Sequence, residues 1–84
     1  MRVTIIREDG IVGVNGLFRP VDLSTLPGGI RAVQWNGASG HIEYDEAANT
    51  RLETIADFQR FIDGWNAAAP QPRDSSGAAE LKNE

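Results

Sequence analysis

The chain has 84 residues, a net charge of −4 at pH 7 and no cysteine. A chain of this length builds one domain, and such a domain buries only about 60% of its unfolded surface. The acidic balance argues against a general nucleic-acid-binding protein, which usually has a basic face. The lack of cysteine excludes disulfides and thiolate metal ligands, and it fits a reducing compartment. No apolar run approaches the roughly 20 residues of a membrane span, so we expect no membrane partner and no signal peptide.

The first part of the chain predicts a short antiparallel meander of three strands. Residues 3–7 (VTIIR) form a β-branched run that predicts the first strand, and residues 11–14 (IVGV) predict the second. Asp9-Gly10 between them suits a two-residue type I′ turn. Asn15-Gly16 predicts another turn of this type before a third strand that begins at residues 17–19.

These two turns predict a consistent register. They set Ile5 opposite Val14 and Gly13 opposite Phe18. Ile5, Val14 and Leu17 then share one face of the sheet. On the other face, either the Phe18 ring covers the gap beside Gly13 or Gly13 forms a local bulge, and the sequence is compatible with both arrangements.

Residues 30–44 (IRAVQWNGASGHIEY) predict the hairpin around which the rest of the chain is arranged. Because a slip of one residue would move every side chain to the opposite face, the apolar pattern restricts the register. We expect Trp35 opposite Ile42, with residues 37–40 as the loop and Gly40 in the left-handed conformation. The residues expected on the apolar face are Arg31, Val33, Trp35, Ile42 and Tyr44.

The second half of the chain predicts one C-terminal helix. Residues 45–53 are polar and predict a connector, after which Thr54 suits a helix N-cap with Asp57 three residues later. Apolar residues at helical spacing predict one buried stripe, formed by Ile55, Phe58, Phe61, Ile62, Trp65 and Ala68. Pro70 ends the helix, and the composition of residues 70–84 is typical of disorder, which predicts a flexible C-terminal tail.

Two prolines limit the sheet before the central hairpin. Pro20 restricts further pairing, so residues 21–23 are at most an edge segment, and Pro27-Gly28 suits the centre of a type II turn. A short amphipathic helix is marginal alone and must pack on the sheet. We therefore expect an α+β fold in which an antiparallel β-meander of four to five strands has one C-terminal helix packed across one face. This single domain spans residues 1–69.

His41 is the only histidine and the one candidate proton shuttle, and Glu43 is its neighbour on the same strand face. A solvated strand shows the same pattern, and the sequence contains no phosphate-binding loop or nucleophile elbow. The acidic residues within 43–53 lack the central glycine and alternating Asp/Asn positions of a calcium-binding EF-hand loop, so a polar connector is expected there. We expect no enzyme, no catalytic residue, no metal site and no cofactor.

Both tryptophans have two interpretations. Trp35 from the sheet and Trp65 from the helix are expected in the core. The alternative is that one of them is partly exposed and anchors a partner, because tryptophan is frequent at interface hot spots. Trp35, Trp65, His41 and Glu43 are the candidate partner-binding residues.

Residues 32–44 (AVQWNGASGHIEY) resemble a family of small proteins of tailed bacteriophages and prophages, typically encoded among tail-fibre genes. Members are also similar at residues 3–6, at a VDLS-x-LP segment (here residues 21–27) and in a helix that contains a tryptophan, here Trp65. The resemblance covers residues 1–69 and brings no catalytic residues. It implies a phage context, and hence a minor tail or tail-fibre structural or assembly component that binds another tail protein. Such a protein would act in the host bacterial cytoplasm during assembly, or in the virion.

A second resemblance, from Leu26 to Arg51, is to the WW domain, a module that binds proline-rich peptides. The shared segments are LPGGI, GHIEY and NTR. Ile30 stands where that family has its first tryptophan, and no tryptophan or proline follows Arg51 to close the third strand. These departures remove the packing residue and half of the ligand groove, and a WW-like peptide-binding module is kept as the alternative function.

Overall fold

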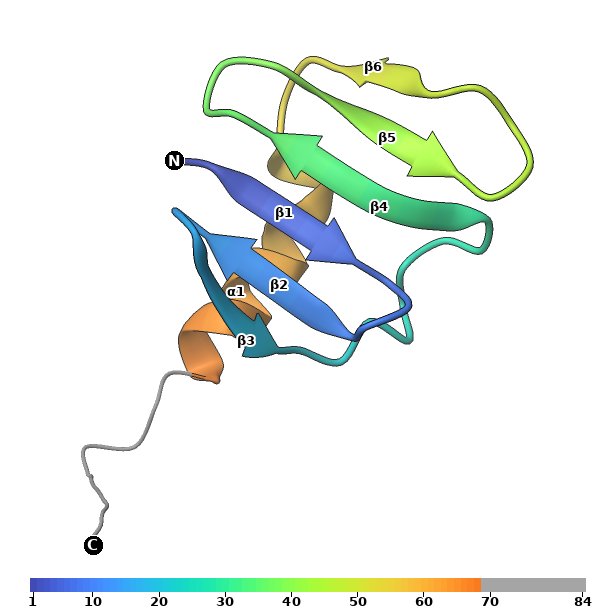
Figure 1. Ribbon diagram of the computed structural model, residues 1–84. Helices are drawn as coiled ribbons and strands as arrows, with labels where there is room; N and C mark the ends of the chain where they lie inside the picture. The colour runs from blue at the N-terminus through green and yellow to red at the C-terminus, as the bar shows by residue number, and fades with distance from the viewer. Residues whose placement is uncertain (69–84) are drawn as a thin grey trace, which may run out of the picture.

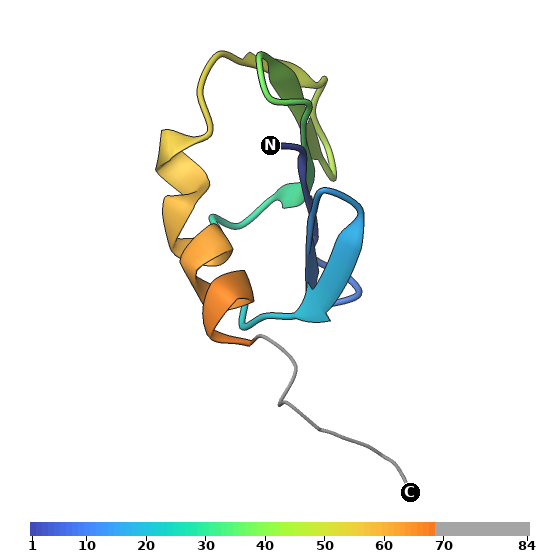
Figure 2. The same cartoon turned by 90° about the vertical axis from the view of Figure 1, so that its left-hand side faces the viewer.

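Six strands form one antiparallel sheet in the computed structural model, which describes residues 1–68 (Figure 1). The strands are β1 (Val3–Ile6), β2 (Ile11–Val14), β3 (Leu17–Pro20), β4 (Ile30–Trp35), β5 (Gly40–Tyr44) and β6 (Thr50–Leu52). A 3-10 turn, η1 (Ala56–Phe58), leads into the helix α1 (Gln59–Ala67), which lies across one face of the sheet (Figure 2). The predicted α+β class and C-terminal helix are confirmed, whereas four to five strands is too low a number. The tail predicted at residues 70–84 lies outside the described residues.

The sheet consists of two three-stranded meanders joined at their first strands, in the order β3-β2-β1-β4-β5-β6. β1 pairs with β4 so that Val3 lies opposite Trp35, and this pairing puts the first strand of the chain in the middle of the sheet. β6 lies in the segment that was predicted to be only a polar connector, and it pairs with β5. The short strand has one buried apolar residue, Leu52, which is too little for a recognisable alternating pattern.

The turn predictions for the first meander are half correct. Asn15 and Gly16 have φ angles of 53° and 88°, as a type I′ turn requires, and the predicted pairing of Gly13 with Phe18 is confirmed. The two-residue turn at Asp9-Gly10 is wrong. Gly10 has a positive φ but Asp9 does not, so the loop is longer and Ile5 lies opposite Val12 instead of Val14.

Phe18 covers the gap beside Gly13. A Cβ built on Gly13 would lie 2.6 Å from the nearest carbon of the Phe18 ring, and the pairing of β2 with β3 runs without a bulge. Of the two arrangements that the sequence allowed, the structure therefore has the ring laid over the glycine.

The central hairpin forms, but its predicted register is wrong. Trp35 lies opposite Gly40, not Ile42, and the loop is closed by a hydrogen bond from the Asn36 N–H to the Ser39 carbonyl (2.9 Å). Gly37, with φ of 103°, takes the left-handed conformation that was expected at Gly40. The Asn36 side chain fixes this register, because its Oδ1 accepts the N–H groups of Ala38 and Ser39 at 2.9 Å each.

The register error spans two residues and therefore leaves most side chains on their predicted faces. Val33 and Ile42 still share the helix side, and His41 and Glu43 still share the other. Arg31 is the exception. An irregularity in pairing between Ile30 and Ala32 leaves Arg31 exposed, so its expected place on the apolar face is wrong.

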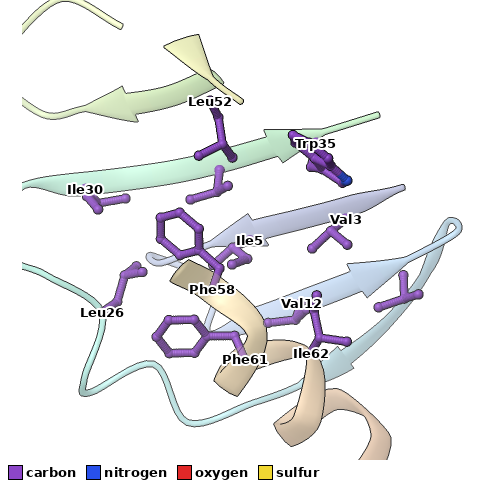
Figure 3. Packing of buried hydrophobic residues seen from close by; sticks show 12 residues of the cluster. Val3, Ile5, Val12, Leu26, Ile30, Trp35, Leu52, Phe58, Phe61 and Ile62 are labelled. Atoms are coloured by element: carbon purple, nitrogen blue, oxygen red, sulfur yellow. The ribbon is translucent and has the colours of Figure 1, made fainter. Parts of the chain in front are cut away.

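The core lies between the sheet and the helix (Figure 3). Phe58, Phe61 and Ile62 of the predicted stripe are buried against the sheet, while Ile55 and Trp65 are half-buried and Ala68 is exposed. The buried residues that they meet are Val3, Ile5, Val12, Val14, Leu26, Ile30, Val33, Trp35 and Leu52.

Two loop predictions shift by a few residues. Thr54 accepts the N–H of Ala56 at 3.2 Å, but a 3-10 turn follows and α1 begins only at Gln59. The turn at Pro27 is closed by the Ile30 N–H on the Pro27 carbonyl, which moves its centre from Pro27-Gly28 to the two glycines before Ile30.

Candidate functional site

One face of the sheet has no helix over it within residues 1–68 (Figure 2). Side chains alternate along a strand, so the residues that come between the buried ones point to this face. A row of residues in register crosses it from β3 to β6: Phe18, Gly13, Thr4, Gln34, His41 and Arg51. We call this surface the open face, and it contains two of the four candidate residues, His41 and Glu43.

The open face is apolar at one end and charged at the other. Phe18 is 48% exposed, and Ile6 and Ile11 lie opposite each other as half-buried residues on the neighbouring strands. Towards β5, the Glu43 carboxylate lies 3.0 Å from His41 Nε2 and 3.3 Å from Arg31 Nη2. A carboxylate only accepts hydrogen bonds, so the Nε2–H of His41 donates to Glu43. The other ring nitrogen, Nδ1, takes no part in this hydrogen bond.

The hydrogen bond with His41 lowers the pKa of Glu43, and Arg31 acts in the same direction. The folded state then binds this proton more weakly than the unfolded chain, whose glutamate pKa is about 4.3. The stability contributed by Glu43 is complete above that value and is lost as the pH falls through the lower pKa of the folded state.

We therefore expect Glu43→Gln to reduce the fall in unfolding free energy between about pH 5 and pH 3. At pH 7 the same variant is expected to lose roughly 0.2–1 kcal/mol, because Glu43 and its two hydrogen-bond partners are near solvent. Urea unfolding at several pH values measures both effects. If the unfolding free energies of the wild type and the variant changed with pH in parallel, the stabilising role assigned to the Glu43 carboxylate would be wrong.

A hollow of about 210 Å³ lies where the open face meets the β4–β5 loop. We call it the hollow, and its lining residues are Arg2, Gln34, Trp35, Asn36, Ser39, Gly40 and His41. The candidate residues His41 and Trp35 therefore meet here, with Glu43 bonded to His41 on the same strand. Sequence reasoning missed Arg2, Asn36 and Ser39, because Arg2 reaches the two loop residues only through the pairing of β1 with β4, which is not encoded locally.

The two tryptophans lie in separate places. Trp35 is 8% exposed and belongs to the core, as the first interpretation expected. Trp65 is half-buried and contacts β3: its indole N–H donates to the Leu17 carbonyl (2.8 Å), and the Arg19 guanidinium lies 3.7 Å from its ring centroid. Trp65 thus packs the end of α1 against the edge strand β3, away from the hollow.

A second groove, of about 420 Å³, lies between α1 and residues 20–25. Arg60 borders it, but its guanidinium already donates to Thr25 Oγ1, to the Thr25 carbonyl and to the Asp57 carbonyl. The groove is otherwise lined mainly by small and apolar groups, and none of the four candidate residues reaches it.

Residues 1–68 contain neither a metal-binding cluster nor a membrane-spanning helix. Among residues 1–68, no three His, Asp or Glu side chains gather closely enough to hold a metal ion. In the same part of the chain, no helix has the length and apolar character needed to cross a membrane. Comparisons with protein-family models, with curated proteins and with solved structures found no match for this chain.

Proposed function

We propose that this chain is a non-enzymatic protein of a tailed bacteriophage or prophage, a minor tail or tail-fibre structural or assembly component. It binds another tail or tail-fibre protein in the host bacterial cytoplasm during assembly, or in the virion. The phage context rests on the resemblance of residues 32–44 and the segments around them. The mode of action, protein binding, rests on the open face.

The observation that carries the proposal is Phe18, a large apolar side chain that is 48% exposed in the middle of a β-strand. Ile6, Ile11 and Pro20 extend the apolar surface on the adjacent strands, since Ile11 lies opposite both Ile6 and Pro20. An apolar patch with an aromatic residue, bordered by charged groups, is typical of a protein interface.

The sheet edges are poorer docking sites than the open face. β6 has only three residues, and β3 ends at Pro20, which has no N–H for a further strand. The Leu17 carbonyl of β3 also accepts the indole N–H of Trp65. Short edges of this kind discourage pairing with another chain, which favours binding through side chains of the open face.

Deletion of the gene from a phage that encodes this protein tests the proposal. We expect altered particle morphology, fibre attachment or infectivity, restored by the wild-type gene but not by Phe18→Ser. Leu17→Ser is the matched control, because Leu17 is 54% exposed on the same strand but points to the opposite face, and it should restore function. A deletion without any effect on particles or infectivity would overturn the proposal.

The WW-like alternative makes a different prediction for the purified protein. Titration with proline-rich peptides would then shift the tryptophan fluorescence in a saturable way, whereas our proposal expects no change. Two observations favour the latter: Trp35 is in the core, and Ile30, which replaces the first WW tryptophan, is 5% exposed.

A further inference from the structure

We infer that the hollow receives a carboxylate, the side chain of an aspartate or glutamate on the partner protein. This inference rests on the proposed function and names the chemistry of one contact. The hollow lies on the same open face as the apolar patch, with β2 and β1 between Phe18 and Gln34, so a partner that spans this face would place other side chains near the β4–β5 loop.

Two amide side chains that line the hollow have hydrogen-bond donors available, because their oxygens already accept hydrogen bonds from the protein. Asn36 Oδ1 accepts two backbone N–H groups, and Gln34 Oε1 accepts the Thr4 hydroxyl at 3.1 Å. Each side chain is left with an amide NH₂ group to donate. Ser39 adds a hydroxyl with no hydrogen bond to another residue in the described chain. A ligand with several acceptor oxygens fits this set.

The charges around the hollow favour an anion. Arg7, Arg31, His41 and Arg51 each lie within salt-bridge distance of a carboxylate in the described part of the chain. Arg2 has no such partner within residues 1–68, and it lines the hollow. Its Nη2 lies 2.7 Å from where a Cβ on Gly16 would be, so in the free protein this end of the guanidinium lies beside the β2–β3 turn.

The size of the hollow and the charge of the chain make the contact selective. A volume of about 210 Å³ accommodates a single side chain rather than a folded segment. The net charge of −4 disfavours acidic partners over most of the surface, so a carboxylate is favoured only where a cation without a carboxylate partner, such as Arg2, lies near. Arginine with amide and hydroxyl donors is a common carboxylate-binding set.

NMR titration of the full-length, ¹⁵N-labelled protein at low salt tests this inference without any phage partner. The probes are the blocked tripeptide Gly-Glu-Gly and its isosteric control Gly-Gln-Gly. We expect the glutamate peptide to shift the backbone amides of Asn36, Ser39, Gly40 and His41, and the glutamine peptide to leave them unchanged. Equal shifts with both peptides, or no shifts with either, would overturn the inference.

Two arginine variants locate the charge that is responsible. Arg2→Gln is expected to weaken binding of the glutamate peptide at least tenfold. Arg7→Gln removes the same charge at the other end of β1, where Arg7 pairs with Asp45, and should leave binding unchanged. Equal losses in both variants, or stronger shifts of these amides with inorganic phosphate than with the peptide, would also overturn it. A silent gene deletion combined with a positive titration would refute the proposed function alone.

Discussion

Phe61→Ala is expected to lower the unfolding free energy by about 3–5 kcal/mol, the usual cost of removing a buried phenylalanine ring. Phe61 is 2% exposed and lies between α1 and the sheet, with its ring centroid 6.4 Å from that of Phe58. Native proteins have only about 5–15 kcal/mol of stability, so this loss is a large share of the total. Urea unfolding followed by circular dichroism measures the change.

The control for Phe61→Ala is an exposed position on the same helix. Gln59→Ala removes only a surface hydrogen bond to Asp63 and should change stability by less than about 0.5 kcal/mol. A loss below about 1 kcal/mol at Phe61 would mean that the helix does not close the core.

Gly40→Ala is expected to be the most damaging small substitution in the sheet. A Cβ at this position would lie 2.0 Å from the Gln34 carbonyl oxygen and 2.9 Å from the Trp35 Cα, both of which are backbone atoms. Backbone cannot move aside as a flexible side chain can, so the β4–β5 pairing must shift. We expect a loss of about 1–3 kcal/mol or more, measured by thermal or urea unfolding.

Gly28→Ala is the matched substitution for Gly40→Ala. A Cβ on Gly28 would meet no atom within 4 Å, and Gly28 is not in the left-handed region. Alanine there reduces the freedom of the unfolded chain and should stabilise the protein by up to about 1 kcal/mol. Equal effects of the two substitutions would show that close backbone contact at Gly40 is not what requires glycine.

The sequence predicts those features that depend on neighbouring residues. Asn15-Gly16 fixes a turn because both positions need positive φ, and the spacing of Phe58, Phe61 and Ile62 fixes the buried side of the helix. The pairing of His41 with Glu43 could also be expected, since residues two apart on a strand share a face.

The features that the sequence does not predict depend on contacts between distant segments. Nothing local indicates that β1 pairs with β4, and this pairing brings Arg2 beside Asn36 and the rest of the hollow. The hairpin register failed for a related reason. Apolar alternation distinguishes odd from even shifts only, and the side chain of Asn36 decided between the two registers that keep the same faces.

The central position of β1 has a consequence for how the chain folds. Each three-stranded half is connected by short turns and can form quickly, but β1 meets β4 only after the intervening β2, β3 and residues 21–29 have been looped out. Closing this loop has an entropic cost that the local turns do not have, so it sets the folding rate. We expect the transition state to be organised around Ile5 and Val33, which face each other where the two halves meet.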